Sequence, residues 1–274
     1  MTDNTQTSAI KRIFWIATFA YIGFGMLIFV THSNMIYHPN LIASDFNNCP
    51  AFAESEKINI NGTRVYYKNN NAYNIIVVYN GNAGSACDRS YLRSVFERYN
   101  YSFLFVEYIG YGGDDRTPSR KGLFNDAENI TELLKTKTYT NTFIFAESLG
   151  AGVASYHSTL MPIKAMIFMT PFDSLINVAK TKFPIYPMFL LEKFSGENYD
   201  NLELLQNYQG ELKIIHGTND RVISFKHGKA LYDGINSPTK KLFPIEGAGH
   251  NNLYNFEEVW EVIAKFLSKN QHNT

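Results

Sequence analysis

Apolar segments alternate with helix-compatible segments along most of this chain, and this alternation constrains the fold more than any other feature. The expected strands are rich in β-branched and aromatic residues and lie at 74–79, 102–107, 142–146, 165–169, 212–216 and 241–245. The expected helices lie near 85–98 and 119–136, directly after Ser148, and near 225–233 and 255–268. Such alternation predicts an α/β fold, a mostly parallel sheet with helices on both faces.

Two segments depart from this alternation. Residues 57–60 and 63–67 flank Asn61-Gly62, a dipeptide typical of a tight β-hairpin. Residues 171–210 separate two expected strands and contain an apolar stretch, which predicts a short lid over the carboxyl ends of the strands. The lid's apolar residues are expected either to line a pocket or touch a membrane, or simply to pack on the core.

A serine turn follows one of the expected strands. Residues 146–150 read AESLG, directly after the apolar residues 142–145 and before a helix-compatible segment. A strand, a sharp turn with serine at its tip and a helix form the context of the G-x-S-x-G nucleophile elbow. Gly150 fits that pattern, whereas Ala146 stands where the first glycine is usual. The segment makes Ser148 a candidate nucleophile, and an ordinary strand-to-helix turn is the alternative.

Two further residues have the types and order that a catalytic serine needs. A serine hydroxyl requires a base to take its proton, and the base requires an orienting acid. Asp220 lies in the loop after strand 212–216, and His250 follows strand 241–245 in a glycine-containing loop. The order Ser148, Asp220, His250 is the order used in one hydrolase fold.

A turn of small residues supplies candidates for an oxyanion hole. The expected strand 74–79 runs into residues 80–85, NGNAGS. Backbone N–H groups in such a turn can stabilise a developing oxyanion. Asn82 is the first candidate donor and Ala83 the next, and Leu149, after the nucleophile, is expected to supply the second N–H group.

These segments together resemble the α/β-hydrolase superfamily, and within it the Bem46-like, serine aminopeptidase-like branch that is anchored in membranes. The matching segments are 80–84 (NGNAG), 107–112 (EYIGYG), 147–150 (ESLG), 170–175 (TPFDSL) and 216–220 (HGTND). The resemblance covers roughly residues 57–268. It implies Ser148 as nucleophile, His250 as base and Asp220 as orienting acid, with no cofactor and no metal.

The chain departs from the family pattern at three positions. Asn80 replaces the usual histidine of the oxyanion segment, Ala146 replaces a glycine, and Ile109 replaces a common arginine. The change at Asn80 is expected to alter hydrogen bonding of the oxyanion loop. None of the three removes a member of the expected triad.

The N-terminal region predicts a membrane anchor. Residues 13–30 carry no charge and would span about 27 Å as a helix, close to the thickness of bilayer hydrocarbon. Lys11 and Arg12 precede this segment, and the next basic residue is Lys57, so the positive-inside rule puts the N-terminus in the cytoplasm. The catalytic domain is then periplasmic or otherwise extracytoplasmic. A cleaved signal peptide and a buried core helix are the alternatives.

The resulting domain organisation has five parts. A cytoplasmic N-terminus covers 1–12, a transmembrane helix 13–30, a linker 31–56, the α/β-hydrolase domain 57–268 and a tail 269–274. Only two cysteines occur, Cys49 and Cys87. In an oxidising compartment they would form one disulfide between the linker and the segment after the oxyanion turn, and otherwise they would be two unrelated buried thiols.

Charge and motifs narrow the function class. Lysine plus arginine and aspartate plus glutamate each number 25, so nothing predicts a nucleic-acid partner. The turn after strand 74–79 lacks the G-x-G-x-x-G pattern of dinucleotide enzymes. The sequence therefore predicts a membrane-anchored serine hydrolase that cleaves a small-molecule or lipid-like acyl ester, thioester or amide. The alternative is a non-catalytic binding module with the same fold, tethered to the membrane.

Overall fold

A single sheet organises the domain, as seen in a computed structural model that describes residues 3–39 and 45–271. Its eight strands lie in the order β1-β2-β4-β3-β5-β6-β7-β8. They are β1 (Glu56–Ile60), β2 (Thr63–Lys68), β3 (Asn74–Tyr79), β4 (Ser102–Glu107), β5 (Asn141–Glu147), β6 (Ala165–Met169), β7 (Glu211–Gly217) and β8 (Lys240–Ile245). The pairings β1–β2 and β2–β4 are antiparallel and the others are parallel. The prediction of a mostly parallel sheet is confirmed.

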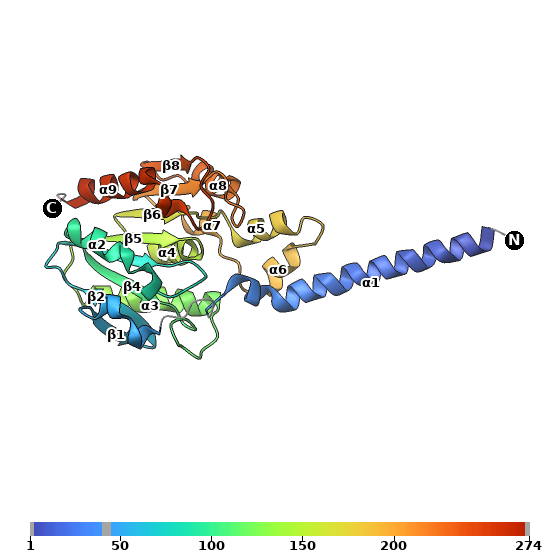
Figure 1. Cartoon of the computed structure of the whole chain (residues 1–274), viewed down its shortest axis with the longest axis horizontal. Helices are drawn as coiled ribbons and strands as arrows, with labels where there is room; N and C mark the ends of the chain where they lie inside the picture. Colours follow the sequence, from blue (N-terminus) through green and yellow to red (C-terminus); the bar gives the residue numbers. More distant parts are fainter. Residues whose placement is uncertain (1–2, 40–44, 272–274) are drawn as a thin grey trace.

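Helices cover both faces of this sheet (Figure 1). They are α2 (Tyr91–Arg98), α3 (Arg120–Lys135), α4 (Leu149–Leu160), α8 (Phe225–Gly234) and α9 (Glu257–Gln271). One apolar cluster joins α3, α4 and α8 to the sheet, and a second joins α2 and α9 to the opposite face. Strand β3 is buried along its whole length, which explains its continuous run of β-branched residues.

The hairpin β1–β2 has the predicted turn. Ile60 pairs with Thr63, and the two residues between them have positive φ angles, 50° at Asn61 and 90° at Gly62. Asparagine and glycine adopt this left-handed backbone more readily than other residues, so the dipeptide fits the tight turn.

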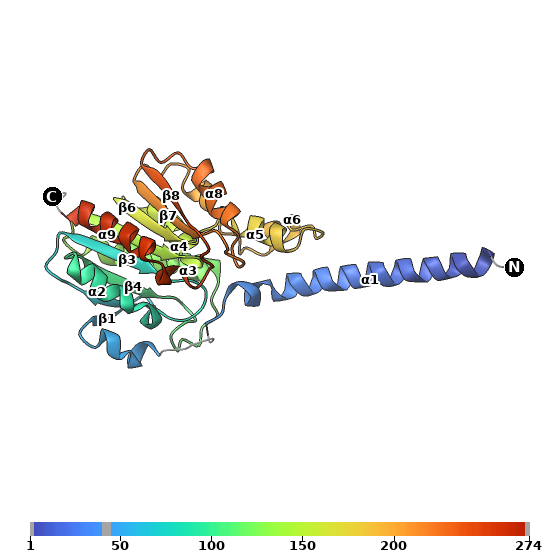
Figure 2. The ribbon, with the colours of Figure 1, turned by 45° about the horizontal axis from the view of Figure 1, so that its top comes forward.

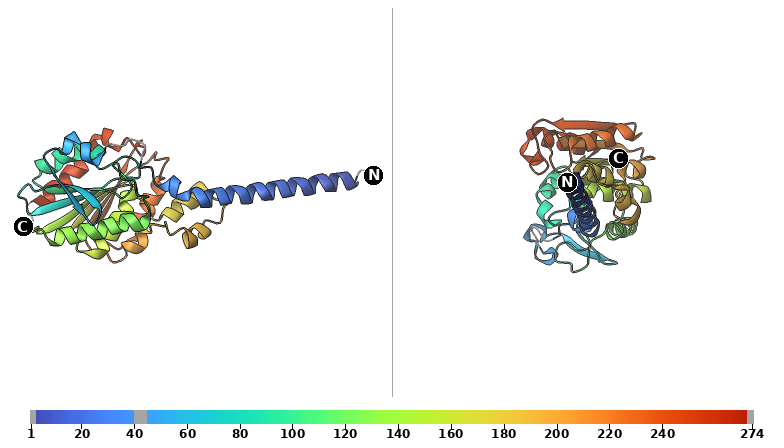
Figure 3. Two further views of the ribbon diagram at one scale, coloured as in Figure 1. Left: turned by 90° about the horizontal axis from the view of Figure 1, so that it is seen from below. Right: turned by 90° about the vertical axis from the view of Figure 1, so that its right-hand side faces the viewer.

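Helix α1 (Asp3–Ile36) extends far beyond the domain (Figures 1 and 3). Its stretch Ser8–Ile36 is long and apolar enough to cross a membrane, and only 6% of its most apolar window is buried. Helices of this kind occur both in membrane anchors and in signal sequences. Within the expected linker 31–56, α1 continues to Ile36 and two short 3₁₀ helices follow, η1 (Phe46–Asn48) and η2 (Pro50–Phe52), while residues 40–44 of that range lie outside the described residues.

Between β6 and β7 lie three short helices, α5 (Leu175–Lys182), α6 (Phe189–Phe194) and α7 (Asn201–Leu204). Helices α5 and α6 project from the domain on the side where α1 leaves it (Figure 2). The lid ends on the core, because Tyr199 packs so closely on α4 that a Cβ at Gly152 would lie 2.5 Å from its ring. The segment thus has a tip outside the domain and a base within it.

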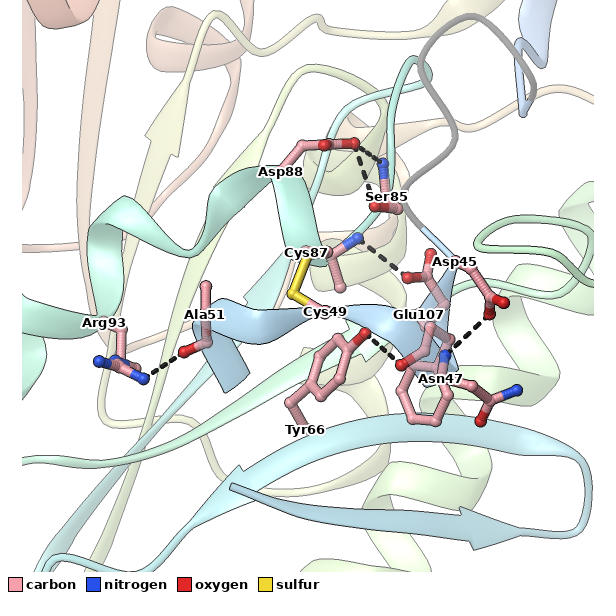
Figure 4. Close-up of a disulfide and its surroundings, with 12 residues drawn as sticks. Asp45, Asn47, Cys49, Ala51, Tyr66, Ser85, Cys87, Asp88, Arg93 and Glu107 are labelled. Atoms are coloured by element: carbon pink, nitrogen blue, oxygen red, sulfur yellow. Dashed lines mark hydrogen bonds between the residues drawn. A yellow bond between two sulfur atoms is a disulfide. The ribbon is translucent and has the colours of Figure 1, made fainter. Parts of the chain in front are cut away.

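A disulfide joins Cys49, between η1 and η2, to Cys87 at the start of η3 (Cys87–Arg89), with Cα atoms 5.9 Å apart (Figure 4). Next to it, the Asp88 carboxylate accepts hydrogen bonds from the backbone N–H and the hydroxyl of Ser85, at 2.7 and 3.0 Å. The disulfide therefore ties the segment after α1 to the turn that follows the candidate oxyanion loop.

Candidate active site

Ser148 occupies the turn between β5 and α4 with a strained backbone, φ 51° and ψ −114°. Its N–H donates to Met169 O at 2.9 Å, and its side chain is nearly buried. A Cβ at Gly150 would lie 2.3 Å from Tyr79 O, so only glycine fits there. A non-glycine residue held at positive φ between a strand and a helix has the geometry of a nucleophile elbow. Ala146 lies buried within β5.

Asp220 and His250 come together although they are far apart in the chain. Asp220 follows β7, His250 follows β8, and His250 Nδ1 lies 2.7 Å from Asp220 Oδ2. The other carboxylate oxygen of Asp220 accepts backbone N–H bonds from Val222 and Ile223, both at 2.8 Å. Strands β5, β7 and β8 are parallel, so the loops that carry Ser148, Asp220 and His250 share one edge of the sheet.

A second histidine, His216, contacts Asp220. Its Nε2 lies 2.9 Å from Ile223 O and 3.4 Å from Asp220 Oδ2, and its ring is fully buried. Burial alone would raise the pKa of Asp220, but hydrogen bonds from His216 and His250 lower that pKa well below its usual range. Asp220 is therefore ionised at neutral pH, and an ionised carboxylate at this position favours the imidazole tautomer of His250 that carries its proton on Nδ1.

Among the hydrogen bonds of the described residues, none joins Ser148 Oγ to His250 Nε2. Catalytic hydrogen bonds are often long in free enzymes and shorten when substrate binds.

Glu147, directly before the serine, connects several loops of the site. It accepts hydrogen bonds from Arg89 Nε at 2.6 Å, from the Tyr91 hydroxyl at 3.3 Å and from the Tyr254 hydroxyl. Arg89 follows the oxyanion loop and Tyr254 follows His250, so one buried carboxylate links three loops of the site.

The candidate oxyanion loop lies against the serine. A Cβ at Gly81 would lie 3.5 Å from Ser148 Cβ, and Asn82 lines the same pocket as Ser148 and Leu149. The Asn82 carbonyl accepts from His38 N at 3.0 Å and from the Tyr111 hydroxyl at 3.1 Å. In the described part of the chain, no hydrogen bond uses the N–H of Asn82. Leu149 is the first residue of α4, so its N–H has no partner in its own helix.

Asn80 is buried at the start of the oxyanion loop. Its Nδ2 donates to Gly81 O at 3.0 Å, and its backbone carbonyl accepts from the Tyr108 hydroxyl at 2.8 Å. Its Oδ1 atom is buried without a hydrogen-bond partner. The Asn80 side chain therefore contacts the backbone of the oxyanion loop and is not among the residues that line the pocket.

A pocket of about 380 Å³ opens above Ser148. Ser148, Leu149 and Asn82 lie at its base. Its walls are mainly apolar and come from the lid, with Leu175, Phe183 and Leu191 among them, and from α1, with Ile28, Met35 and Ile36. Such a cavity fits a hydrocarbon group better than a charged one. Among residues 3–39 and 45–271, no group of three His, Cys, Asp or Glu side chains is placed to hold a metal ion.

Some contacts at the site have no signal in the sequence. The contribution of α1 to the pocket, and the links from Arg89 and Tyr254 to Glu147, join segments that are distant in the chain. A second acid–histidine pair, Asp173 and His227, also lies near the carboxyl ends of the strands, with Nδ1 and Oδ1 2.8 Å apart. The sequence indicated Asp173 only as part of a family segment and did not indicate His227.

Several known proteins similar to this chain carry the name of α/β-hydrolases, although no protein-family model matches it. α/β-Hydrolase domain-containing protein 17B of Homo sapiens is 28% identical over 193 residues, which are 68% of this chain and 64% of that protein. An uncharacterised protein of Mycobacterium tuberculosis is 29% identical over 199 residues, 71% of this chain and 69% of the other.

Solved structures resemble the chain more in fold than in sequence. An esterase of Pyrococcus furiosus superposes with a TM-score of 0.63 at 18% identity, over 78% of this chain and 89% of its own. The protein Est1E of Butyrivibrio proteoclasticus, solved with ferulic acid bound, gives 0.62 at 16% identity, over 78% and 98%. At these identities, the likeness establishes the fold and not the activity.

Proposed function

Because this chain has the α/β-hydrolase fold, we propose that it is a membrane-anchored serine hydrolase. The fold and the likeness to α/β-hydrolases, both predicted from the sequence, are confirmed. The narrower Bem46-like branch stays a prediction, because none of the similar proteins named above bears that name. The catalytic roles, the membrane topology and the substrate form the proposal.

The proposal depends above all on the 2.7 Å contact between His250 Nδ1 and Asp220 Oδ2, at the edge of the sheet where Ser148 sits in a strained turn. Asp220 fixes the imidazole tautomer that leaves Nε2 free to accept a proton. A serine hydroxyl next to such a base is an activated nucleophile. The strained backbone of Ser148 supports this role, since strain of this kind persists where function requires it.

The expected reaction runs through an acyl-enzyme. Ser148 Oγ bonds to the acyl carbon while its proton passes to His250 Nε2, and the carbonyl oxygen becomes an oxyanion that accepts from the N–H groups of Asn82 and Leu149. Collapse breaks the bond to the leaving group, which takes the proton from His250. Water then attacks the acyl carbon and gives a proton to His250. Collapse breaks the bond from that carbon to Ser148 Oγ, which takes the proton back from His250, and the acid product leaves.

The walls of the pocket favour an apolar acyl group. Leu175, Phe183 and Leu191 of the lid and Ile36 of α1 offer hydrocarbon contacts beside the serine. Each methylene that leaves water contributes about 0.8 kcal/mol, so chain length should affect turnover strongly. The acyl group is carried by an ester, a thioester or an amide.

Membrane anchoring rests on α1 and on the disulfide. Lys11 and Arg12 precede the apolar segment, which supports a cytoplasmic N-terminus and an extracytoplasmic catalytic domain by the positive-inside rule. A Cys49–Cys87 disulfide is typical of such an oxidising compartment. Residues of α1 also line the pocket, which favours an uncleaved anchor over a removed signal sequence.

A fluorophosphonate probe tests the catalytic role. The full chain should be labelled covalently, and Ser148→Ala should abolish labelling. Ser195→Ala should retain it, because Ser195 lines the same pocket but lies outside the strained turn that carries Ser148. Turnover of acyl esters of increasing chain length should show an optimum. A folded protein that neither labels nor turns over any ester would instead be the non-catalytic binding module.

A further inference from the structure

The lid does not only cover the pocket, because its tip also contacts the middle of α1. The Tyr21 hydroxyl donates to Ile185 O at 2.7 Å, and the rings of Tyr21 and Tyr186 stack with centroids 4.8 Å apart. The Tyr186 ring also fits over Gly25, where a Cβ would lie 3.3 Å from it. Figures 1 and 2 show α6 next to α1, outside the domain.

The place of this contact along α1 sets the depth of the lid tip. Tyr21 lies well inside the uncharged segment 13–30, and from Tyr21 to Val30 the helix rises about 13 Å at ~1.5 Å per residue. A helix that spans the bilayer with that segment carries Tyr21 near the middle of the hydrocarbon layer, whose thickness is about 30 Å. The lid tip then lies in the same layer.

The lid tip, residues 183–191, has the composition that this depth requires. It reads FPIYPMFLL, without a charged residue. Ile185 is 70% exposed and Phe189 61% exposed, and Leu190 is also exposed. Exposure of these apolar side chains to water is unfavourable in free energy, whereas contact with lipid hydrocarbon is not. Charged residues flank the tip: Lys182 before it, whose Nζ donates to Arg221 O at 2.6 Å, and Glu192 and Lys193 after it. Lys193 is long enough to extend its charge to the headgroups.

The pocket reaches the same layer from the inside. Ile28 belongs to the uncharged segment of α1, is buried and lines the pocket above Ser148. The end of α1 is fixed to the base of the lid, since the Tyr37 hydroxyl lies 2.8 Å from that of Tyr199. Anchor and lid thus enclose the pocket together, and its apolar walls lead from the hydrocarbon layer to the serine.

We propose that the lid tip is inserted into the bilayer beside α1, so that the pocket receives its acyl chain from the hydrocarbon layer and not from water. The inference rests on the proposed membrane span of α1. Its occupant is lipid hydrocarbon, and the substrate it selects is an acyl compound that resides in the bilayer. Helix α1 is then a wall of the binding site as well as an anchor.

Fluorescence quenching tests the insertion on the full chain in phosphatidylcholine nanodiscs. In a background of Trp15→Phe and Trp260→Phe, a single tryptophan is introduced as Ile185→Trp or Phe189→Trp. Tyr73→Trp is the matched control, because Tyr73 is 66% exposed and precedes β3 at the opposite edge of the sheet. Phosphatidylcholine brominated along its acyl chains should quench both lid probes strongly and leave the control unchanged.

Lid probes that are quenched no more than the Tyr73→Trp control would overturn the proposal. Self-association of the protein through the lid, detected by cross-linking at Phe189, together with unquenched probes would assign the tip to a second copy of the chain. The measurement is repeated with Ser148→Ala, which should give the same quenching. Insertion can therefore fail while fluorophosphonate labelling succeeds, or succeed while labelling fails.

A kinetic measurement adds a second readout. The double variant Ile185→Asp/Phe189→Asp places charges in the tip, so turnover of a long-chain ester embedded in vesicles should fall by about tenfold or more relative to turnover of a short soluble ester. An equal fall on both substrates would mean that the tip only supports the structure of the lid, and that result would count against insertion.

Discussion

Two acid–histidine pairs lie near the carboxyl edge of the same sheet, and they differ in whether the second ring nitrogen of the histidine has a partner. In the first, His250 Nδ1 lies 2.7 Å from Asp220, and in the second His227 Nδ1 lies 2.8 Å from Asp173. The second ring nitrogen of His227 lies 3.1 Å from Thr181 Oγ1 of α5, so both of its nitrogens are engaged. In the described part of the chain, no partner occupies Nε2 of His250.

The comparison shows that an acid–histidine contact does not by itself make a catalytic base. His227 is buried and joins α8 to the base of the lid, which is a structural role. His250 is slightly exposed and has one nitrogen free for a proton. The pair that keeps a nitrogen free is expected to act on substrate, and the pair that uses both is expected to hold the lid in place.

The largest expected effect separates the two histidines. His250→Gln removes the base and should lower kcat by about 10⁶-fold, as happens when a triad histidine is lost. His227→Gln is the matched variant and should retain most of the activity. The measurement is kcat on a short soluble acyl ester. Equal losses in the two variants would remove the distinction between the pairs.

The two aspartates should differ in the same direction by a smaller factor. Asp220→Asn keeps the shape of the side chain but favours the wrong imidazole tautomer, so kcat should fall by about 10⁴-fold. Asp173→Asn should change kcat little. Steady-state kinetics on both purified variants checks this, and an Asp220→Asn variant with near wild-type kcat would exclude the proposed triad.

The free energy of unfolding should depend more on the Asp173–His227 pair than on the Asp220–His250 pair. Asp173 also accepts a hydrogen bond from Asn177 Nδ2 at 2.6 Å, so its carboxylate holds α5 at the domain surface. His227→Ala leaves this buried acceptor without its histidine partner and should lower the free energy of unfolding by about 1–3 kcal/mol. Urea unfolding in detergent measures the change. A variant as stable as the wild type would argue that the second pair has no structural role.

The smallest expected effect is a difference in acid sensitivity. Burial alone would raise the pKa of Asp173, but hydrogen bonds from His227 and Asn177 lower it. A lowered folded-state pKa contributes stability that is complete above the unfolded value, about 3.9, and is lost as pH falls through the folded value. Asp173→Asn should therefore lose less stability than the wild type below pH ~4. Parallel urea midpoints for the two proteins would contradict this.

The sequence predicted the sheet, its helices and the order Ser148, Asp220, His250, because each depends on a local pattern of strand, turn and small residues. It did not predict the pairing of Asp173 with His227, since His227 lies on α8 within an ordinary amphipathic pattern. Contacts between distant segments decide this pairing, and a single sequence carries no local signal for it.

The place of α1 beside Ser148 has a practical consequence for recombinant work. Membrane enzymes with one anchor are commonly expressed without it, to obtain a soluble domain. Here, a shortened chain that begins after α1 would lack Ile28, Met35 and Ile36, and the rest of the pocket would lie open as an exposed apolar groove. Such a product should aggregate or take up detergent, and any activity measured on it would describe the truncated domain and not the full chain.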